Sequence, residues 1–349
     1  MNKARELIES WIGGGLLPGG VLLVRTPDGR KILEAFGSSR EDTLFDLASL
    51  TKVMATLPVL LTLIAAGKLS LDDSVAGFVP EFRFRQVTVR HLLSHSSGLP
   101  GDLPNVARHA SDRDIGKEIF AQPLLFESGT RALYSDLGMI VLGWIAEKAG
   151  GDRLDRLARR YVLEPLGMKD TMFRPPESLS DRIAPTETVD GIAIRGAVHD
   201  EKCFLLGGVC GSAGLFSTAA DVAVYADWWL DNVSAARMDI PRPLMDACTR
   251  PVIGNRGLGW EVWSGTGDPP GCGGRWSVGS YGHTGFTGTS LWIDPVRRFY
   301  VVFLTNAIHL GRENCKIREL RPILHSVIFS SFFADEITVK KQDEWGKRA

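Results

Sequence analysis

Strand-like segments are confined to the two ends of this 349-residue chain, and that distribution constrains its fold more than any other feature. Residues 21–25 and 31–35 are apolar segments on either side of a Pro-Asp-Gly turn, which predicts a hairpin. Residues 289–294 and 299–304 predict a second hairpin. Between about residues 72 and 250 the pattern is helical and rich in loops. We therefore expect both ends to build one sheet, with helices between them.

The predicted fold class is α/β (α+β), in two parts. Residues 1–71 and 255–349 are expected to form the sheet domain, and residues 72–254 a mainly helical lobe. A site cleft is expected where the two parts meet. A last helix is predicted over about residues 313–331, followed by a charged tail from Asp335.

Ser49 and Lys52 form a Ser-x-x-Lys sequence just ahead of the longest apolar helical run. Residues three apart face the same side of a helix, so the two side chains are expected to meet. A serine hydroxyl needs a base within hydrogen-bond reach to act as a nucleophile. A lysine at the start of an apolar helix is partly desolvated, which predicts a lowered pKa and some neutral amine. For the pair alone, the alternative is a helix cap followed by a solvated lysine.

Tyr134-Ser135-Asp136 lies between a turn-prone stretch and an apolar helix predicted over residues 137–149. A tyrosine at that position can project its phenol into a cleft and, beside a lysine, serve as a general base. Taken alone, a tyrosine such as Tyr134 is more often a packed aromatic side chain with its hydroxyl satisfied, and Asp136 is most often a helix N-cap.

A glycine-rich segment, residues 282–290, contains His283-Thr284-Gly285 and leads into a predicted strand. Glycines on a strand usually mark a place where something comes close to the backbone. A substrate carbonyl is one such group, and an exposed N–H there could help to form an oxyanion hole. A bulge packed against a neighbouring segment is the open alternative.

Together the three motifs resemble those of the serine β-lactamase and penicillin-binding protein superfamily, and most closely its class C branch. The resemblance covers about residues 20–325 and implies a β-lactamase/transpeptidase-like fold, with an antiparallel sheet flanked by helices and an all-helical lobe. Further segments that resemble this branch are residues 69–75, 91–99, 163–168 and 214–218.

The resemblance also implies a role for each motif residue. Ser49 would be the nucleophile, Lys52 the base or activator, and Tyr134 the general acid and base. The backbone N–H groups of Ser49 and Phe286 would form the oxyanion hole. No metal or organic cofactor is implied. The residues expected to contact the substrate are Asp136, His283, Thr284 and Gly285.

Two residues depart from the class C pattern. Asp136 replaces an asparagine, and an ionised carboxylate cannot donate a hydrogen bond; it would repel a carboxylate substrate unless it pairs with Lys52. His283 replaces a lysine, which weakens the fixed positive charge, and it is expected to hydrogen-bond toward Tyr134 or a substrate carboxylate. Both departures argue against efficient β-lactam hydrolysis. His-Thr-Gly occurs among the DD-peptidases and esterases of the family.

Composition excludes several classes of function. The formal net charge is −1, so no basic field attracts nucleic acid or anionic lipid. The apolar run over residues 53–66 is too short to span a bilayer, and the amino end does not resemble a signal peptide, so a cytoplasmic location is expected. The oligomeric state stays open. No disulfide framework or zinc site is expected from the five cysteines, Cys203, Cys210, Cys248, Cys272 and Cys315.

These observations predict a serine hydrolase that acts through an acyl-enzyme on an ester or amide, with a carboxylesterase-like activity preferred. A DD-peptidase, penicillin-binding protein or weak β-lactamase is the alternative, and an inactive binding scaffold is the alternative of another class. The partner is a small-molecule or peptide substrate. Its identity depends on loops that could close over the cleft, at residues 98–105, 187–202 and 265–276.

Overall fold

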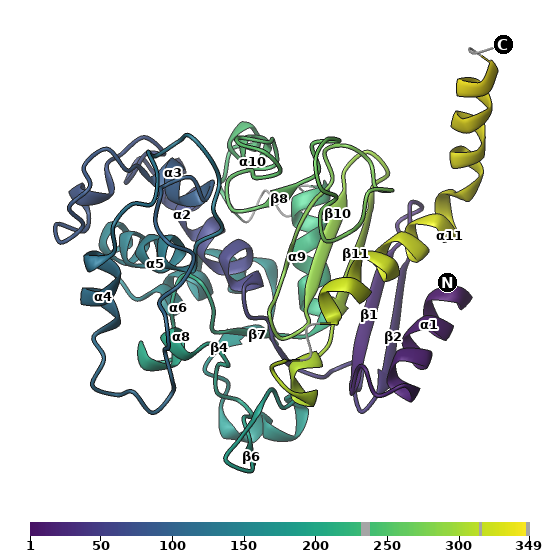
Figure 1. Ribbon diagram of the computed structural model, residues 1–349, viewed down its shortest axis with the longest axis horizontal. Helices are drawn as coiled ribbons and strands as arrows, with labels where there is room; N and C mark the ends of the chain where they lie inside the picture. The colour runs from purple at the N-terminus through teal and green to yellow at the C-terminus, as the bar shows by residue number, and fades with distance from the viewer. Residues whose placement is uncertain (232–237, 314–315, 347–349) are drawn as a thin grey trace.

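The centre of the molecule is a six-stranded antiparallel sheet (Figure 1). The computed structural model describes residues 1–231, 238–313 and 316–346, with side chains described as far as residue 333. The strand order is β2-β1-β11-β10-β9-β8, so both chain ends contribute to one sheet, as predicted. The strands are β1 (Gly19–Arg25), β2 (Lys31–Gly37), β8 (Glu261–Val262), β9 (Tyr281–Thr284), β10 (Ser290–Asp294) and β11 (Phe299–Leu304).

Both faces of the central strands are buried. Alternate residues of a strand point to opposite faces, and those of β11 enter two different apolar clusters. Helices α1 (Asn2–Gly13) and α11 (Ile317–Gly346) cover one face, and α9 (Ala219–Asp231) covers the other (Figure 1). Burial on both sides explains why β11 is apolar throughout its length. The residues of β11 in the cluster with α1 and α11 are Phe299, Val301 and Phe303; those in the main core are Tyr300, Val302 and Leu304.

The main core continues beyond α9 into a group of helices around α2 and α5. The division of the chain at residues 72 and 254 stays a prediction, and α9, which falls between those limits, contacts β1, β10 and β11. The α-helices of this region are α2 (Leu57–Ala65), α3 (Val89–Leu93), α4 (Ile115–Ala121), α5 (Asp136–Gly150), α6 (Leu154–Ala158), α7 (Glu164–Leu166), α8 (Glu201–Leu205) and α10 (Arg242–Cys248).

Short elements connect these layers. Two small antiparallel sheets, β3-β7-β4 and β5-β6, lie outside the large one. Their strands are β3 (Phe45–Asp46), β4 (Met172–Phe173), β5 (Thr188–Val189), β6 (Ile192–Ala193) and β7 (Leu215–Ser217). The π-helical turns are η1 (Lys52–Thr56) and η3 (Arg159–Leu163), and the 3₁₀ turns are η2 (Val75–Gly77), η4 (Glu177–Arg182) and η5 (Ala307–Leu310).

The last helix differs from its prediction. It begins at Ile317 and continues to Gly346, with a non-helical residue at Phe333. The prediction ended the helix because the sequence becomes charged, but the lysine, glutamate and glutamine found there are good helix formers. None of the helices in the described parts of the chain is both long and apolar enough to cross a membrane. The described cysteines are buried thiols, and Cys315 lies outside the described residues.

Candidate active site

Ser49 lies in a strained turn between β3 and the helical segment that begins at Leu50. The preceding residue, Ala48, has a φ of 48°, in the left-handed region that non-glycine residues seldom adopt. Its N–H donates a hydrogen bond of 2.9 Å to the buried carboxylate of Asp46. Backbone strain that the surroundings enforce is common at functional sites. Here it presents Ser49 at the end of the turn.

Lys52 reaches back from η1 to the serine. Its Nζ donates hydrogen bonds to Ser49 Oγ at 2.7 Å and to the carbonyl oxygen of Ser212 at 2.8 Å. The same Nζ forms an ion pair of 2.7 Å with Asp136 Oδ1, and the lysine side chain is fully buried. The spacing of three residues therefore brings the two side chains together, as the sequence predicted.

The charge state of Lys52 differs from the prediction. Burial opposes its positive charge, but the negative charge of Asp136 and the contact with Tyr134 outweigh burial, so the pKa of Lys52 is raised above its ordinary value. The expected fraction of neutral amine is therefore wrong. Local sequence showed the desolvation of Lys52 but not the carboxylate that α5 places against it.

Tyr134 packs against the same lysine. Lys52 Nζ lies 5.2 Å from the centre of its ring, and the Arg256 guanidinium lies at the same distance from it. Burial raises the pKa of Tyr134, Lys52 lowers it, and Asp136 raises it again. The net direction is upward, so the resting side chain is a neutral phenol. The N-cap of α5 is Ser135, whose Oγ accepts the N–H of Gly138, which leaves Asp136 facing the lysine rather than capping the helix.

The third motif is tied to the serine turn. His283 and Thr284 end β9, and Gly285 begins the turn toward β10. A Cβ on Gly285 would lie 2.1 Å from Thr289 Oγ1 and 2.5 Å from the carbonyl oxygen of Leu47, so only glycine fits there. The glycines of this motif predict that some group comes close to the backbone. At Gly285 that group is the protein's own segment before Ser49.

Hydroxyl groups and one buried arginine hold the two segments in register. Thr287 Oγ1 donates to the Asp46 carbonyl at 2.7 Å, and Thr289 Oγ1 donates to the Leu47 carbonyl at 3.0 Å. From α11, Arg321 Nη1 donates to the carbonyls of Gly285 and Thr289 at 3.0 and 2.8 Å. These bonds fix the position of the glycine turn relative to the serine turn.

Two backbone donors are left at this junction. The N–H groups of Ser49 and Phe286 have no acceptor among the described residues. Phe286 is half-exposed, and its ring stacks on His199 with the centroids 5.6 Å apart. The two N–H groups predicted for an oxyanion hole thus stand on two segments that bond directly to each other.

His283 is a neutral, buried side chain. Its Nδ1–H donates to the carbonyl oxygen of Thr284 at 2.9 Å, and its Nε2 has no partner among the described residues. Burial, Lys52 and Arg256 place its pKa well below the ordinary value. The expected hydrogen bond to Tyr134 is not formed, although the two rings lie 5.8 Å apart. The reduced positive charge expected at this position is therefore observed.

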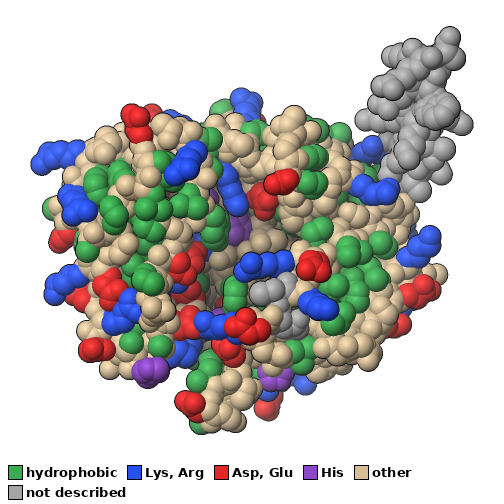
Figure 2. All heavy atoms as spheres, in the orientation of Figure 1, with side chains coloured by type: hydrophobic (Ala, Val, Ile, Leu, Met, Phe, Trp, Pro, Cys, Tyr) green, Lys and Arg blue, Asp and Glu red, His purple; other side chains and the backbone are tan. Residues whose placement is uncertain are grey.

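A cleft of about 380 Å³ opens beside these groups. Figure 2 shows a hollow on this face with Lys and Arg side chains near its rim. Arg256 and Arg318 line the cleft and have no carboxylate within ion-pair distance among the described residues. Two carboxylates, Asp136 and Glu261, also line the cleft, and Glu261 interacts with Arg256, but the arginines of the lining outnumber them, so the lining carries net positive charge despite the neutral His283. All of the predicted site residues except Lys52, which is buried behind Ser49, line it: Ser49, Tyr134, Asp136, His283, Thr284, Gly285 and Phe286.

Several charged residues at the site were missed in the sequence, among them Arg256, Arg321 and Lys202. Each lies outside the three motifs, and each acts through contacts with segments distant in the chain. An arginine among the apolar residues of the last helix, three residues after Arg318, was the only sequence signal for Arg321. From sequence alone, a buried arginine of this kind cannot be told from one that faces solvent, because the difference lies in the segments that pack around it.

Comparison with known proteins decides the family. The sequence profile described as Beta-lactamase matches residues 7–322. The chain belongs to the beta-lactamase family. This beta-lactamase-family protein is 34% identical over 324 residues to the "Putative D-alanyl-D-alanine carboxypeptidase" of Escherichia coli strain K12, covering 81% of the chain and 73% of that protein. It is 32% identical over 360 residues to the N-acetylmuramyl-L-alanine amidase of Bacillus subtilis strain 168, covering 88% and 81%.

Solved structures agree on the fold of this beta-lactamase-family chain. A class C beta-lactamase superposes with a TM-score of 0.72 at 21% identity, covering 93% of the chain and 95% of that structure. The predicted superfamily and its β-lactamase/transpeptidase-like fold are confirmed. The protein is thus a hydrolase of the beta-lactamase fold, a family whose members are serine hydrolases.

Proposed function

We propose that this protein is a serine hydrolase in which Ser49 forms an acyl-enzyme with an amide or ester substrate. The observation that supports this most directly is the 2.7 Å hydrogen bond between Lys52 Nζ and Ser49 Oγ, beside Tyr134, which lines the cleft. A nucleophile within hydrogen-bond reach of a proton-accepting pair is the arrangement that activates a serine.

In the proposed reaction, the Lys52/Tyr134 pair first loses one proton to solvent; Ser49 Oγ then attacks the carbonyl carbon and its proton passes to the pair. The bond to the leaving group then breaks, and Tyr134 returns a proton to that group. A water molecule attacks the acyl-enzyme, gives its proton to the same pair and releases the acid. Because Lys52 and Tyr134 interact strongly, they titrate as one coupled system rather than as separate bases.

The negative charge that develops on the carbonyl oxygen needs donors that are already in place. The free N–H groups of Ser49 and Phe286 are the proposed pair. Losing one such donor typically costs about 3 kcal/mol of transition-state stabilisation. The bonds from Thr287, Thr289 and Arg321 support this assignment, because they hold the two donor segments together before substrate arrives.

The charge of the cleft supports a substrate with an anionic group. Arg256 and Arg318 offer two guanidinium groups that form no ion pair within the described parts of the chain, which suits carboxylate recognition. Asp136 is paired with Lys52, which offsets the repulsion that an isolated carboxylate would cause. The names of the two relatives refer to a carboxypeptidase and an amidase. We therefore place amide hydrolysis of a carboxylate-bearing peptide first.

Hydrolysis of a neutral ester is the second candidate, and it uses the same acyl-enzyme. The observation that favours it is the neutral His283, which removes from β9 the charge expected of an efficient β-lactamase. Neither candidate requires a metal or an organic cofactor, since the proposed proton transfers and charge stabilisation use groups of the chain itself.

The test is hydrolysis of p-nitrophenyl butyrate and of an N-acylated peptide ending in D-alanyl-D-alanine. Wild type is compared with Ser49→Ala and with Ser39→Ala, which removes a hydroxyl outside the cleft. Turnover of either substrate by wild type and Ser39→Ala, with loss in a folded Ser49→Ala variant, supports the proposal. Equal activity of all three proteins contradicts the role of Ser49 as the nucleophile. Inertness of wild type toward both substrates contradicts the proposal and favours the binding-scaffold alternative.

A further inference from the structure

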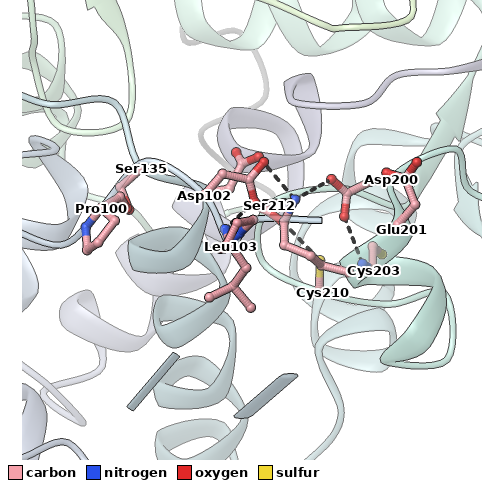
Figure 3. A network of polar contacts seen from close by, with 12 residues as sticks. Pro100, Asp102, Leu103, Ser135, Asp200, Glu201, Cys203, Cys210 and Ser212 are labelled. Carbon is pink, nitrogen blue, oxygen red and sulfur yellow. Dashed lines mark hydrogen bonds and ion pairs between the residues drawn. The ribbon is translucent and has the colours of Figure 1, made fainter. Parts of the chain in front are cut away.

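Lys202 is a buried cation behind the cleft. It lies in α8, and only 4% of its side chain is exposed. Its Nζ is 2.8 Å from Asp102 Oδ1, 3.1 Å from Asp200 Oδ2 and 3.8 Å from Asp136 Oδ2. In Figure 3, dashed contacts run from Asp102 and from Asp200 to one nitrogen between them. Burying an ammonium group is costly unless it is paired, so these carboxylates account for a lysine at this depth.

The three carboxylates come from separate segments. Asp102 belongs to the loop of residues 98–105, and its side chain is 57% exposed. Asp136 is the first residue of α5. Asp200 caps α8 by accepting the N–H of Cys203 at 2.8 Å. Lys202 therefore joins three parts of the helical region directly behind the proposed catalytic groups.

Asp136 is shared between two ammonium groups. Its Oδ1 pairs with Lys52 at 2.7 Å, and its Oδ2 faces Lys202 at 3.8 Å. Two cations on opposite oxygens fix the direction of the carboxylate better than one cation would. Without Lys202, Asp136 would keep only Lys52 as an ammonium partner among the described residues, and its Oδ2 would have no cation to hold it.

We infer that Lys202 is a positioning residue, which orients Asp136 and balances the negative charge that the Lys52/Tyr134 pair experiences. This inference rests on the proposed function, because it concerns how that pair accepts the proton of Ser49. Lys202 touches no substrate in this role: it acts on the reaction only through Asp136 and Lys52.

The other charged groups around the pair are accounted for. Arg256 faces the Tyr134 ring and adds positive charge from the other side. His95 and His283 also face this ring, and burial lowers the pKa of both well below the ordinary value, so they are neutral. Asp200, Asp136 and Asp102 raise the pKa of Lys202 against the effect of burial, so its own charge is constant near neutral pH.

The test measures how fast a fluorophosphonate probe labels Ser49 at each pH between about 7 and 11, because the pKa values of Lys52 and Tyr134 both lie above their ordinary values. In this labelling a bond forms between Ser49 Oγ and phosphorus, the phosphorus–fluorine bond breaks, fluoride leaves, and the serine proton goes to the Lys52/Tyr134 pair. The rate therefore rises with pH as the pair loses its proton. The readout does not depend on knowing the natural substrate.

Removing a positive charge makes the pair hold its proton more tightly. Lys202→Met is therefore expected to move the rising limb of the profile upward by roughly 0.5–1 pH unit, which is a 3- to 10-fold loss of rate below the limb. Asp102→Asn removes a negative charge and is expected to move the limb downward by a smaller amount. The double variant should return toward wild type. A merely structural role would not produce shifts of opposite sign.

Lys117→Met is the matched control, since it removes one lysine that is 86% exposed and pairs only with Asp114 among the described residues. Its profile should coincide with that of wild type. If Lys202→Met does not fold, the direction in which the pH profile of Asp102→Asn shifts is enough to test the inference. If Asp102→Asn is labelled but its pH profile is unshifted or moves to higher pH, the inference about Lys202 is overturned. Ser49 would still be the nucleophile, because labelling occurs. Equal absence of labelling in wild type and Ser49→Ala overturns both proposals.

Discussion

The Oδ1 atom of Asp136 lies 2.7 Å from the Nζ atom of Lys52, so the lysine that contacts Ser49 is held as an ammonium. This ion pair changes what the Ser-x-x-Lys motif can do by itself. The pKa of Lys52 is raised because the carboxylate and Tyr134 outweigh the effect of burial. The serine proton must therefore go to a coupled pair whose charge Asp136 controls.

Replacing Asp136 with asparagine should shift the pH dependence of serine labelling. The carboxylate raises the pKa of both Lys52 and Tyr134, so removing it lowers both. The rising limb of the labelling profile is expected to move to lower pH, by roughly one unit. An unshifted limb, or a shift to higher pH in a folded Asp136→Asn variant, would show that the carboxylate does not control the pair.

Replacing Gly285 with alanine should damage both stability and activity. The new Cβ would lie 2.1 Å from Thr289 Oγ1 and 2.5 Å from the Leu47 carbonyl, so the two turns must move apart. Overpacking of this kind costs roughly 1–3 kcal/mol of unfolding free energy. Separation of the turns also displaces the N–H of Phe286 from that of Ser49, and a fall in turnover of about 100-fold or more is expected.

Urea denaturation and steady-state kinetics measure these two effects. Gly13→Ala is the matched control, because nothing lies within 4 Å of the added Cβ at the end of α1 and the backbone there has no positive φ. It should unfold and turn over like wild type. A fully active Gly285→Ala enzyme would rule out the turn as part of the oxyanion hole.

Replacing Arg256 with glutamine should lower activity on anionic substrates more than on neutral ones. Its guanidinium is unpaired among the described residues and lines the cleft. For a peptide with a free carboxylate, kcat/KM is expected to fall about 10- to 100-fold, since hydrogen bonds to charged groups contribute about 1.5–3 kcal/mol. For the same peptide with an amidated end, the kcat/KM of the variant should stay close to that of wild type.

The ratio of kcat/KM for the two peptides is the quantity to compare. Arg250→Gln removes an exposed arginine outside the cleft lining and should leave the ratio unchanged. An equal loss of kcat/KM on both peptides would mean that Arg256 acts through Tyr134 and not through substrate recognition. Its guanidinium lies 5.2 Å from the centre of the Tyr134 ring.

The buried His325 should make the fold less stable at acid pH. Burial and the nearby Arg321 lower its pKa from 6.5 to about 3, so the unfolded chain binds a proton that the folded protein does not. Its contribution is therefore fully present above pH 6.5 and is lost as pH falls toward 3. The loss by pH 5 is about 2 kcal/mol for this one residue. His95 and His283 act in the same direction.

Urea denaturation of wild type and His325→Gln at pH 7 and pH 5 checks this expectation. The variant loses the contact with Ser290 Oγ and is less stable at pH 7. Its unfolding free energy should nevertheless change by about 2 kcal/mol less between the two pH values. Parallel losses in the two proteins would mean that His325 does not contribute to acid sensitivity.

Much of the fold could be predicted because its signals are local. The hairpin of β1 and β2 follows from two apolar segments and a turn sequence. The contact of Ser49 with Lys52 follows from helical spacing alone. The end of α11 was misplaced because a charged sequence is compatible with both a helix and a tail.

The sequence by itself therefore determined the family, the two hairpins of the large sheet and the positions of the three motifs, because each depends on residues close together in the chain. The short strands β4 to β7, in the middle of the chain, were not predicted. Tertiary structure alone decided the charge of Lys52, the place of Arg256 in the cleft and the burial of Lys202 among three carboxylates. Those properties depend on the electrostatic field from distant segments. A pKa is set by every charge and by the burial around a group, and no local pattern records which segments will supply them.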